Sequence, residues 1–135
     1  MEERSVLHPN QFQVNEAWIA FRLNSVPIRT EQDGDLNCIA LMDAASCFIL
    51  GATLIPVKDG DLSRAEALDL MGKARRHKQQ WPRTLFIPRE DAGRWLSREA
   101  AKQDIDVVRV PESEVLIFIE DARQGFSERF GEIPQ

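Results

Sequence analysis

The stretch that most constrains the fold is a pair of apolar runs between Asn37 and Pro56, separated by the short segment 43–46 (Asp-Ala-Ala-Ser). Both runs are rich in Ile and Leu, and neither contains a charged side chain. A run that is apolar on both faces is typical of a strand buried on both sides of a sheet. The sequence therefore predicts a buried hairpin, with residues 43–46 as its turn.

The residues before the hairpin predict an arm and one further strand. Residues 1–16 contain a polar stretch with Pro9, and we expect a loosely attached N-terminal arm. Residues 14–23 fit either the apolar face of a helix or a strand. Because Pro27 disfavours a helix through the preceding residues, we predict a strand over residues 17–24.

Strands and helices alternate after the hairpin. Residues 63–66 (Ser-Arg-Ala-Glu) form a capping box, which predicts that a helix begins at Ser63. Ser113 is the expected N-cap of the last helix, and Gly131 the residue after its end. Hairpin strands followed by strand–helix alternation predict a mixed sheet with right-handed crossovers. After the hairpin, the predicted elements are helix 63–78, strand 83–88, helix 90–102, strand 105–110 and helix 113–131.

The length and composition fit a single α/β domain. The chain has 135 residues, of which 43% are hydrophobic and 29% charged, which suffices for a core. We place the domain at residues 17–131, followed by a tail of residues 132–135. No apolar run is long enough to cross a membrane, and the charged N-terminus does not resemble a signal peptide, so we expect a cytoplasmic protein. The net charge of −5 disfavours a dedicated nucleic-acid binder.

The cysteines and histidines do not suggest a disulfide or a metal centre. With a tight turn at residues 43–46, Cys38 lies opposite residues 51–53 rather than opposite Cys47, so we expect two buried free thiols. His8 and His77 lie far apart without metal-ligand spacing. Neither histidine has the context of a nucleophilic triad.

The order of these elements resembles the ribonuclease H-like fold, as found in the catalytic cores of retroviral integrases and transposases. Residues 44–46 resemble the small-residue turn of that family, and residues 49–52 its Ile-x-Gly/Ala pattern. Residues 54–55 then match a closing apolar pair, and an Ala- and Leu-rich helix follows. The resemblance covers residues 17–131. It implies a mixed five-stranded sheet, with strands 1–3 antiparallel, strands 4 and 5 parallel, and helices packed on it.

The same resemblance implies chemistry for which the chain lacks residues. These enzymes hold two metal ions about 4 Å apart between carboxylates on the first strand, after the fourth strand and on the last helix. Here residues 18–23 contain no acid, and Arg89 stands near the second position, where a cation repels Mg²⁺. We therefore expect that the metal carboxylates are lost and that no cofactor binds. The acids that remain nearby are Glu90, Asp91, Glu114, Glu120 and Asp121.

A second register keeps more acids. If residues 36–43 formed the first strand, Asp43, Asp91 and Glu120 would give a metal-dependent nuclease or phosphodiester-transfer enzyme that uses Mg²⁺ or Mn²⁺, with Glu90 and Asp121 as substitutes. Residues 57–62 would then have to form the third strand, for which their charges and glycine are poor. In the favoured register Asp43 is a turn residue, at the edge opposite the metal site. An unrelated α/β fold is the third alternative.

One basic region could contact nucleic acid. It consists of Lys73, Arg75, Arg76, Lys78 and Arg83. Because cations near a helix C-terminus also interact favourably with the helix dipole, we favour a solvated face. Trp81 and Trp95 could stack on bases, but the helical spacing of Trp95 and Leu96 favours the core.

The last helix begins with a continuous apolar run, residues 115–119, that one helical face cannot bury. We expect Val115, Phe118 and Ile119 to cover the sheet, and Leu116 and Ile117 to face solvent unless something packs on them. The arm or a second subunit would supply that cover, and we favour a homodimer. The leading interpretation is therefore a non-catalytic ribonuclease H-like domain that acts as a protein-binding or self-associating module.

Overall fold

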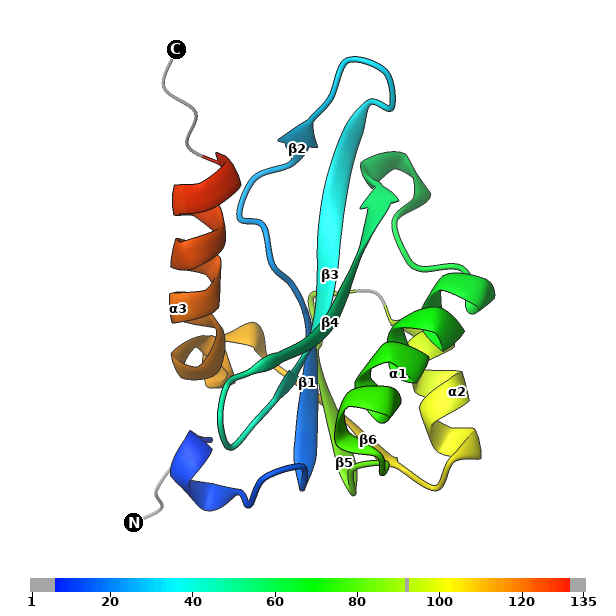
Figure 1. Cartoon of the computed structure of the whole chain (residues 1–135), viewed down its shortest axis with the longest axis vertical. Coiled ribbons are helices and arrows are strands. Elements are labelled where there is room, and N and C mark those ends of the chain that lie inside the picture. The colour runs from blue at the N-terminus through cyan, green and yellow to red at the C-terminus, as the bar shows by residue number, and fades with distance from the viewer. Residues whose placement is uncertain (1–6, 92, 132–135) are drawn as a thin grey trace.

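In the computed structural model, which describes residues 7–91 and 93–131, a mixed sheet of six strands lies between α1 and α2 on one face and α3 on the other (Figure 1). None of the helices in these residues is long and apolar enough to span a membrane. The strands are β1 (Ala17–Arg22), β2 (Ile28–Arg29), β3 (Asp35–Asp43), β4 (Ile49–Pro56), β5 (Thr84–Pro88) and β6 (Asp106–Val110). The helices are α1 (Arg64–Lys78), α2 (Arg94–Lys102) and α3 (Leu116–Phe126), and the shorter helical turns are η1 (Pro9–Gln11), η2 (Val57–Asp59), η3 (Glu112–Glu114) and η4 (Ser127–Gly131).

The sheet combines an antiparallel half with a parallel half. β1 pairs antiparallel with β3, and β3 pairs antiparallel with β4. On its other side β1 pairs parallel with β5, which pairs parallel with β6. The predicted mixed sheet is thus confirmed, but the predicted number of strands was too small. The additional strand, β2, extends the β1–β3 connection and pairs with the first residues of β3.

The central strand β1 explains why the sheet is apolar on both faces. Trp18 and Ala20 belong to the core beneath α1 and α2, whereas Ala17, Ile19 and Phe21 belong to the core beneath α3. All five side chains are buried. A strand covered on both faces has an almost continuous apolar sequence. The predicted strand at residues 17–24 is confirmed, but it ends at Arg22.

The ends of two helices differ from the prediction. Glu90 and Asp91 lie in a turn after β5, and α2 begins only at Arg94. α3 begins at Leu116, and no side chain caps it, so the prediction of Ser113 as its N-cap was wrong. Ser113 lies instead within the 3-10 turn η3.

The capping box at the start of α1 is confirmed. Ser63 Oγ accepts a hydrogen bond from the Glu66 backbone N–H at 3.1 Å, and Glu66 Oε1 accepts one from the Ser63 backbone N–H at 2.8 Å. Both bonds satisfy amides that the first helical turn leaves without partners.

The β3–β4 hairpin is confirmed with a one-residue difference in register. Cys38 lies opposite Leu54, because a bulge between Leu41 and Met42 shifts the pairing. The two thiols are free, as predicted, but only Cys38 is buried, whereas Cys47 is half-buried. Burial raises the pKa of both thiols, and the nearby carboxylates of Asp43 and Asp121 raise that of Cys47 further.

Asp43 ends β3 and is fully buried, with 0% of its surface exposed. Its carboxylate accepts hydrogen bonds from the backbone N–H of Asn15 at 2.7 Å, from the backbone N–H of Ser46 at 3.0 Å and from Ser46 Oγ at 2.7 Å. Asp43 is therefore a turn residue, as the favoured register requires.

Asn15 extends this network to the rest of the molecule. Its Oδ1 accepts a hydrogen bond from Trp18 Nε1 at 2.6 Å, and its Nδ2 donates one to the Gln80 carbonyl at 3.2 Å. The backbone of Asn15 has a positive φ of 64°, which asparagine tolerates better than most residues. The network therefore joins the arm, the central strand and the α1–β5 connection.

Replacing Asp43 with alanine should lower the free energy of unfolding by about 3 kcal/mol, because each buried donor left without an acceptor costs about 1–3 kcal/mol. Asp35→Ala is the matched control, because Asp35 lies in the same strand and is exposed. We expect a change within about 0.5 kcal/mol for the control. Urea denaturation followed by tryptophan fluorescence measures both, and equal midpoints for the two variants would contradict the role of Asp43.

Candidate functional site

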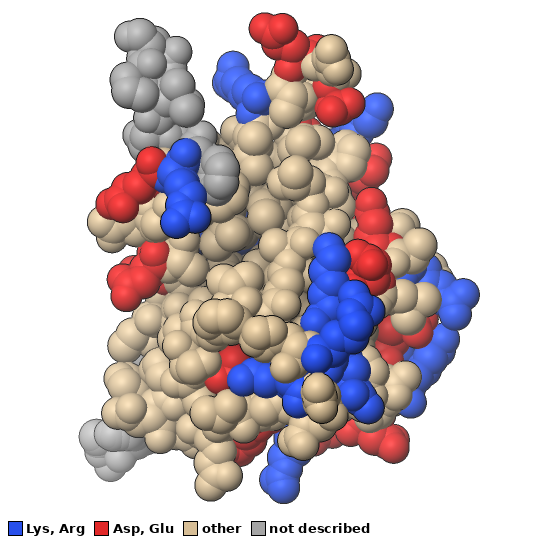
Figure 2. Space-filling model, in the orientation of Figure 1, with Lys and Arg blue, Asp and Glu red and all other residues tan. Residues whose placement is uncertain are grey.

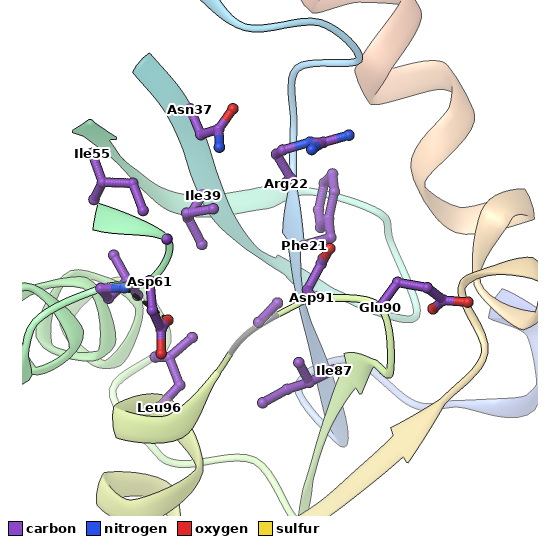
Figure 3. Close-up of a pocket in the computed structure, with 13 residues that line it drawn as sticks. Phe21, Arg22, Asn37, Ile39, Ile55, Asp61, Ile87, Glu90, Asp91 and Leu96 are labelled. Atoms are coloured by element: carbon purple, nitrogen blue, oxygen red, sulfur yellow. Dashed lines mark hydrogen bonds between the residues drawn. The ribbon is translucent and has the colours of Figure 1, made fainter. Parts of the chain in front are cut away.

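A cavity of about 140 Å³ opens where β1 and β5 end (Figure 3). The two strands pair from Ala17 and Thr84 to Ile19 and Phe86, and their pairing ends there within the described residues. Crevices at the carboxyl ends of parallel strands are common binding sites in α/β proteins. The apolar lining comes from Ala20, Phe21, Ile39, Ile55, Leu62, Ile87 and Leu96, and the polar lining from Arg22, Asn37, Asp61, Glu90 and Asp91.

Asp61 is fixed by the start of α2. Its Oδ2 accepts a hydrogen bond from the Arg94 backbone N–H at 3.1 Å, and its Oδ1 accepts one from the Leu62 backbone N–H at 2.7 Å. A carboxylate at this position also interacts favourably with the positive end of the helix. Asp61 thus replaces the side-chain cap that Gly93, the residue before the helix, cannot supply.

Asp91 is the most perturbed acid of the cavity. Its Oδ2 is buried and has no hydrogen-bond partner among the described residues. Burial raises the pKa of the Asp91 carboxyl, and the nearby Glu112 carboxylate raises it further. The charges of Arg22 and Arg123 and a backbone hydrogen bond from Arg22 oppose this shift without cancelling it.

The rim of the cavity is held together by hydrogen bonds to the backbone. Glu90 Oε1 accepts a hydrogen bond from the Glu112 backbone N–H at 2.9 Å, so this oxygen already has a partner within the chain. Arg22 Nε donates to the Asn24 carbonyl at 2.9 Å. Arg123 Nε donates to the Arg22 carbonyl at 3.0 Å, and its guanidinium pairs with Glu112 at 2.6 Å.

The structure does not bring the alternative acids Asp43, Asp91 and Glu120 together. Asp43 lies opposite Trp18, near the start of β1, which is about 13 Å of strand from the cavity end of β1. Glu120 is exposed on α3. In the described part of the chain, no group of three His, Cys, Asp or Glu side chains is placed to hold a metal ion.

The alternative register itself was wrong. It required a strand over residues 57–62, but residues 57–59 form the 3-10 turn η2. The third strand is β4, as the favoured register predicted.

The predicted basic residues lie away from the cavity, at the C-terminal half of α1 and the start of β5. Figure 2 shows Lys and Arg side chains gathered over α1. Lys73 Nζ donates to the Ala52 carbonyl at 3.3 Å and pairs with Asp69 at 3.3 Å. Arg75 lies over the Trp81 ring at 5.5 Å, while Arg76 is exposed. Lys78 is half-buried and Arg83 is exposed.

Both tryptophans singled out from the sequence pack against the core. Trp95 is half-buried there, and the guanidinium groups of Arg94 and Arg98 lie over its ring at 5.5 and 5.2 Å. Trp81 packs on Trp18 with 6.0 Å between ring centroids. Trp95 therefore contacts the core as expected but is not fully buried in it.

The N-terminal half of α3 is covered in part by the arm. Phe12 of the arm packs on Phe86 and Phe118, with ring centroids 5.8 and 6.2 Å apart. Leu116 is half-buried on the same core, but Ile117 stays 51% exposed. The arm is therefore one cover, and the predicted contact of this helix with a second subunit stays a prediction.

The sequence alone did not single out Arg22 and Asp61 as residues of the site. Arg22 is the one charged residue of β1, which was a usable signal that the buried run ends there. Asp61 accepts a hydrogen bond from the backbone N–H of Arg94, which lies 33 positions further along the chain. No local sequence pattern predicts such a contact.

The comparisons with known proteins give a fold likeness. No protein-family model and no curated protein matches the sequence. A chain in the cryo-EM structure of the simian T-cell lymphotropic virus intasome in complex with the PP2A regulatory subunit B56 gamma is similar, with a TM-score of 0.53 and 13% identity. The match covers 97% of this chain and 46% of that chain, so this chain spans less than half of its structural neighbour. At this identity the likeness concerns the fold alone.

Asp91→Asn should raise the free energy of unfolding at pH 7 by about 1 kcal/mol, because the uncharged amide avoids burying a charged oxygen without a partner. The folded-state pKa of Asp91 is raised, so ionisation destabilises the fold above that pKa. The penalty fades as the pH falls, and it vanishes below the unfolded value of about 3.9.

Urea denaturation at several pH values tests this dependence, with the exposed Asp106→Asn on β6 as the control. The gain of Asp91→Asn should shrink from neutral to acid pH, and the control should show no such trend. A gain that grows as the pH falls would contradict the direction of the shift.

Proposed function

We propose that this chain is a non-catalytic domain of the ribonuclease H-like fold that works by binding protein, either a partner or a second copy of itself. The observation that carries the proposal is the state of the acids at the β1–β5 cavity. Asp61 and Glu90 accept backbone N–H groups, and Asp91 is half-buried beside Arg22. A binding role fits such a site better than metal-dependent chemistry does.

The strand order supports this choice of fold. Across the sheet the order is β4, β3, β1, β5 and β6, and β2 pairs in addition with the first residues of β3. This order places the antiparallel strands on one side of β1 and the parallel strands on the other, as the integrase resemblance implies. The likeness to the viral intasome chain points the same way.

The residues at the cavity do not fit a pair of divalent metal ions. Two-metal sites need carboxylate oxygens that converge on one point and are free to coordinate. Here the β1 residues of the cavity are Ala20, Phe21 and Arg22, which supply a cation and no acid. A cation in this place repels Mg²⁺ and Mn²⁺, so we derive no reaction step through a metal.

A metal titration tests the non-catalytic half of the proposal. We expect no heat of binding and no rise of the thermal midpoint at about 1 mM Mg²⁺ or Mn²⁺, because no group of acids in residues 7–91 and 93–131 converges to hold a metal ion. A thermal midpoint that rises with Mn²⁺, and rises equally in Asp43→Asn, would support a metal-dependent enzyme with Asp91 and Glu120 as metal ligands. Loss of that rise in Asp91→Asn would then assign the ligand.

The exposed side of α3 supports the protein-binding half. Ile117 is 51% exposed beside the half-buried Leu116, although the arm covers the neighbouring Phe118. Apolar surface of this kind often marks an interface. The structural neighbour belongs to a complex that contains another protein, which is consistent with a role in protein interactions.

Light scattering tests self-association through this surface. We expect a dimer at tens of micromolar and a monomer for Ile117→Glu, because a buried charge without a partner disrupts an apolar interface. Leu68→Glu is the matched control, since Leu68 is a 44% exposed apolar residue on α1. A wild-type monomer, unchanged in mass by Ile117→Glu, would remove the dimer and leave the arm as the cover.

A further inference from the structure

The strand β4 lies at an edge of the sheet. Among the described strands it pairs only with β3 (Figure 1). Its eight residues, Ile49–Pro56, contain no charged side chain. An edge strand presents backbone donors and acceptors that another strand can pair with. Soluble proteins usually protect such an edge with charges, bulges or proline.

The backbone groups that face outward can be assigned from the pairing of Cys38. Its N–H donates to Asn24 Oδ1 and its carbonyl accepts from the Leu23 N–H, both at 2.7 Å, so both groups point toward β1. Its partner across the hairpin, Leu54, therefore forms a pair without hydrogen bonds, and the N–H and carbonyl of Leu54 point away from β3. By the same alternation, the backbone N–H and carbonyl of Ala52 also point away from β3. The hydrogen bond from Lys73 Nζ to the Ala52 carbonyl confirms this direction.

The accessible part of this edge is short and bounded. Pro56 is the next outward position and has no N–H to donate. At the other end, the register shift opposite Leu41 and Met42 interrupts the regular strand. Between these limits the outward backbone groups are those of Ala52 and Leu54, and the Ala52 carbonyl already accepts a hydrogen bond from Lys73. Leu54 is 52% exposed, as is Phe48 just before the strand.

Lys73 fixes a positive charge at this edge. Its stem crosses closely over Gly51, where an added Cβ would lie 3.2 Å from the Lys73 Cβ. Its Nζ then reaches the outward carbonyl of Ala52 at 3.3 Å and also pairs with Asp69 of α1 at 3.3 Å, so a carboxylate of an added strand would share this ammonium with Asp69. Arg76 is exposed one turn further along α1, and Figure 2 shows the cations of α1 beside a broad surface without charge.

This charge selects among the strands that could pair. A second copy joined by antiparallel β4 strands would bring two Lys73 ammonium groups to the same short edge. Two ammonium groups close together repel each other. An acidic strand would instead gain ion pairs with Lys73 and Arg76. A nucleic acid offers no strand hydrogen bonds, and the net charge of −5 opposes its approach.

We propose that the β4 edge binds an extended acidic peptide segment, which adds to the sheet as a further strand. Its backbone pairs with Ala52 and Leu54, its carboxylates meet Lys73, and its apolar side chains contact Leu54. The inference rests on the proposed protein-binding function and names its surface and the chemistry of its partner. Strand addition of this kind takes affinity from main-chain hydrogen bonds and specificity from alternate side chains.

The test uses a fluorescent synthetic peptide in which valine and glutamate alternate, and follows its polarisation. Leu54→Pro removes one outward N–H and leaves the β3 ladder intact, and Lys73→Glu reverses the charge at the edge. We expect each to weaken binding by about tenfold or more, because lost strand pairing and charge repulsion each exceed about 1.4 kcal/mol. Arg89→Glu is the control, because Arg89 is exposed in the loop after β5, and it should bind as the wild type does.

Two further measurements locate the contact. Hydrogen exchange at the Ala52 and Leu54 amides should slow when the peptide binds, and a peptide that alternates valine and lysine should not bind. Thermal midpoints and far-UV circular dichroism show whether each variant is folded. Should Leu54→Pro fail to fold, Lys73→Glu and the two amide exchange rates still decide the question.

The proposal is overturned if the acidic peptide does not bind at millimolar concentration, or binds equally to both edge variants. A single-stranded thymidine oligonucleotide that binds in its place would assign the cations to nucleic acid. A wild-type dimer that Leu54→Pro converts to a monomer would assign the edge to a second copy. The metal titration does not depend on β4, and Ile117→Glu dissociates a dimer through α3 but not a dimer through β4, so failure here is distinguishable from failure of the proposed function.

Discussion

The carboxylate of Asp43 is fully buried, and it accepts three hydrogen bonds from Asn15 and Ser46. A buried carboxyl group in this position is stable only while its donors stay in place, because a buried polar group without hydrogen bonds is costly. The arm residue Asn15 must therefore remain docked, and through it Trp18 and the α1–β5 connection are held. The end of the sheet opposite the cavity is thus fixed by polar contacts.

At the cavity end of the sheet, carboxylates accept hydrogen bonds from the backbone of this chain. Asp61, which precedes α1, caps the start of α2, and Glu90 accepts a hydrogen bond from the backbone N–H of Glu112, the first residue of η3. The sheet still produces an opening where the parallel strands diverge, because that geometry follows from the topology and not from any one residue. Arg22 and the apolar lining then decide what the opening can hold. Fold and chemistry are separable here, as they are in other widely used folds.

Much of the architecture follows from local patterns in the sequence. The apolar runs on either side of Asp43 specify the hairpin, and the capping box at Ser63 specifies the start of α1, since each depends on neighbours within a few positions. Where the structure differs, the cause is a contact made across the fold. α2 begins late because Asp61 caps it from 33 positions away, and β2 is too short to show a period. The cavity residues were harder still to foresee, because only the pairing of β1 with β5 brings Arg22 near Asp91.

The close passage of Lys73 over Gly51 has a consequence for sequence variation. Any side chain at residue 51 would enter the space of the Lys73 stem, and the ammonium could not then stay at the Ala52 carbonyl without a shift of α1. The two positions are therefore coupled, although they belong to different elements. Among homologues, a larger residue at 51 should accompany a smaller one at 73. In such homologues the outer carbonyl of β4 would face solvent without its cation.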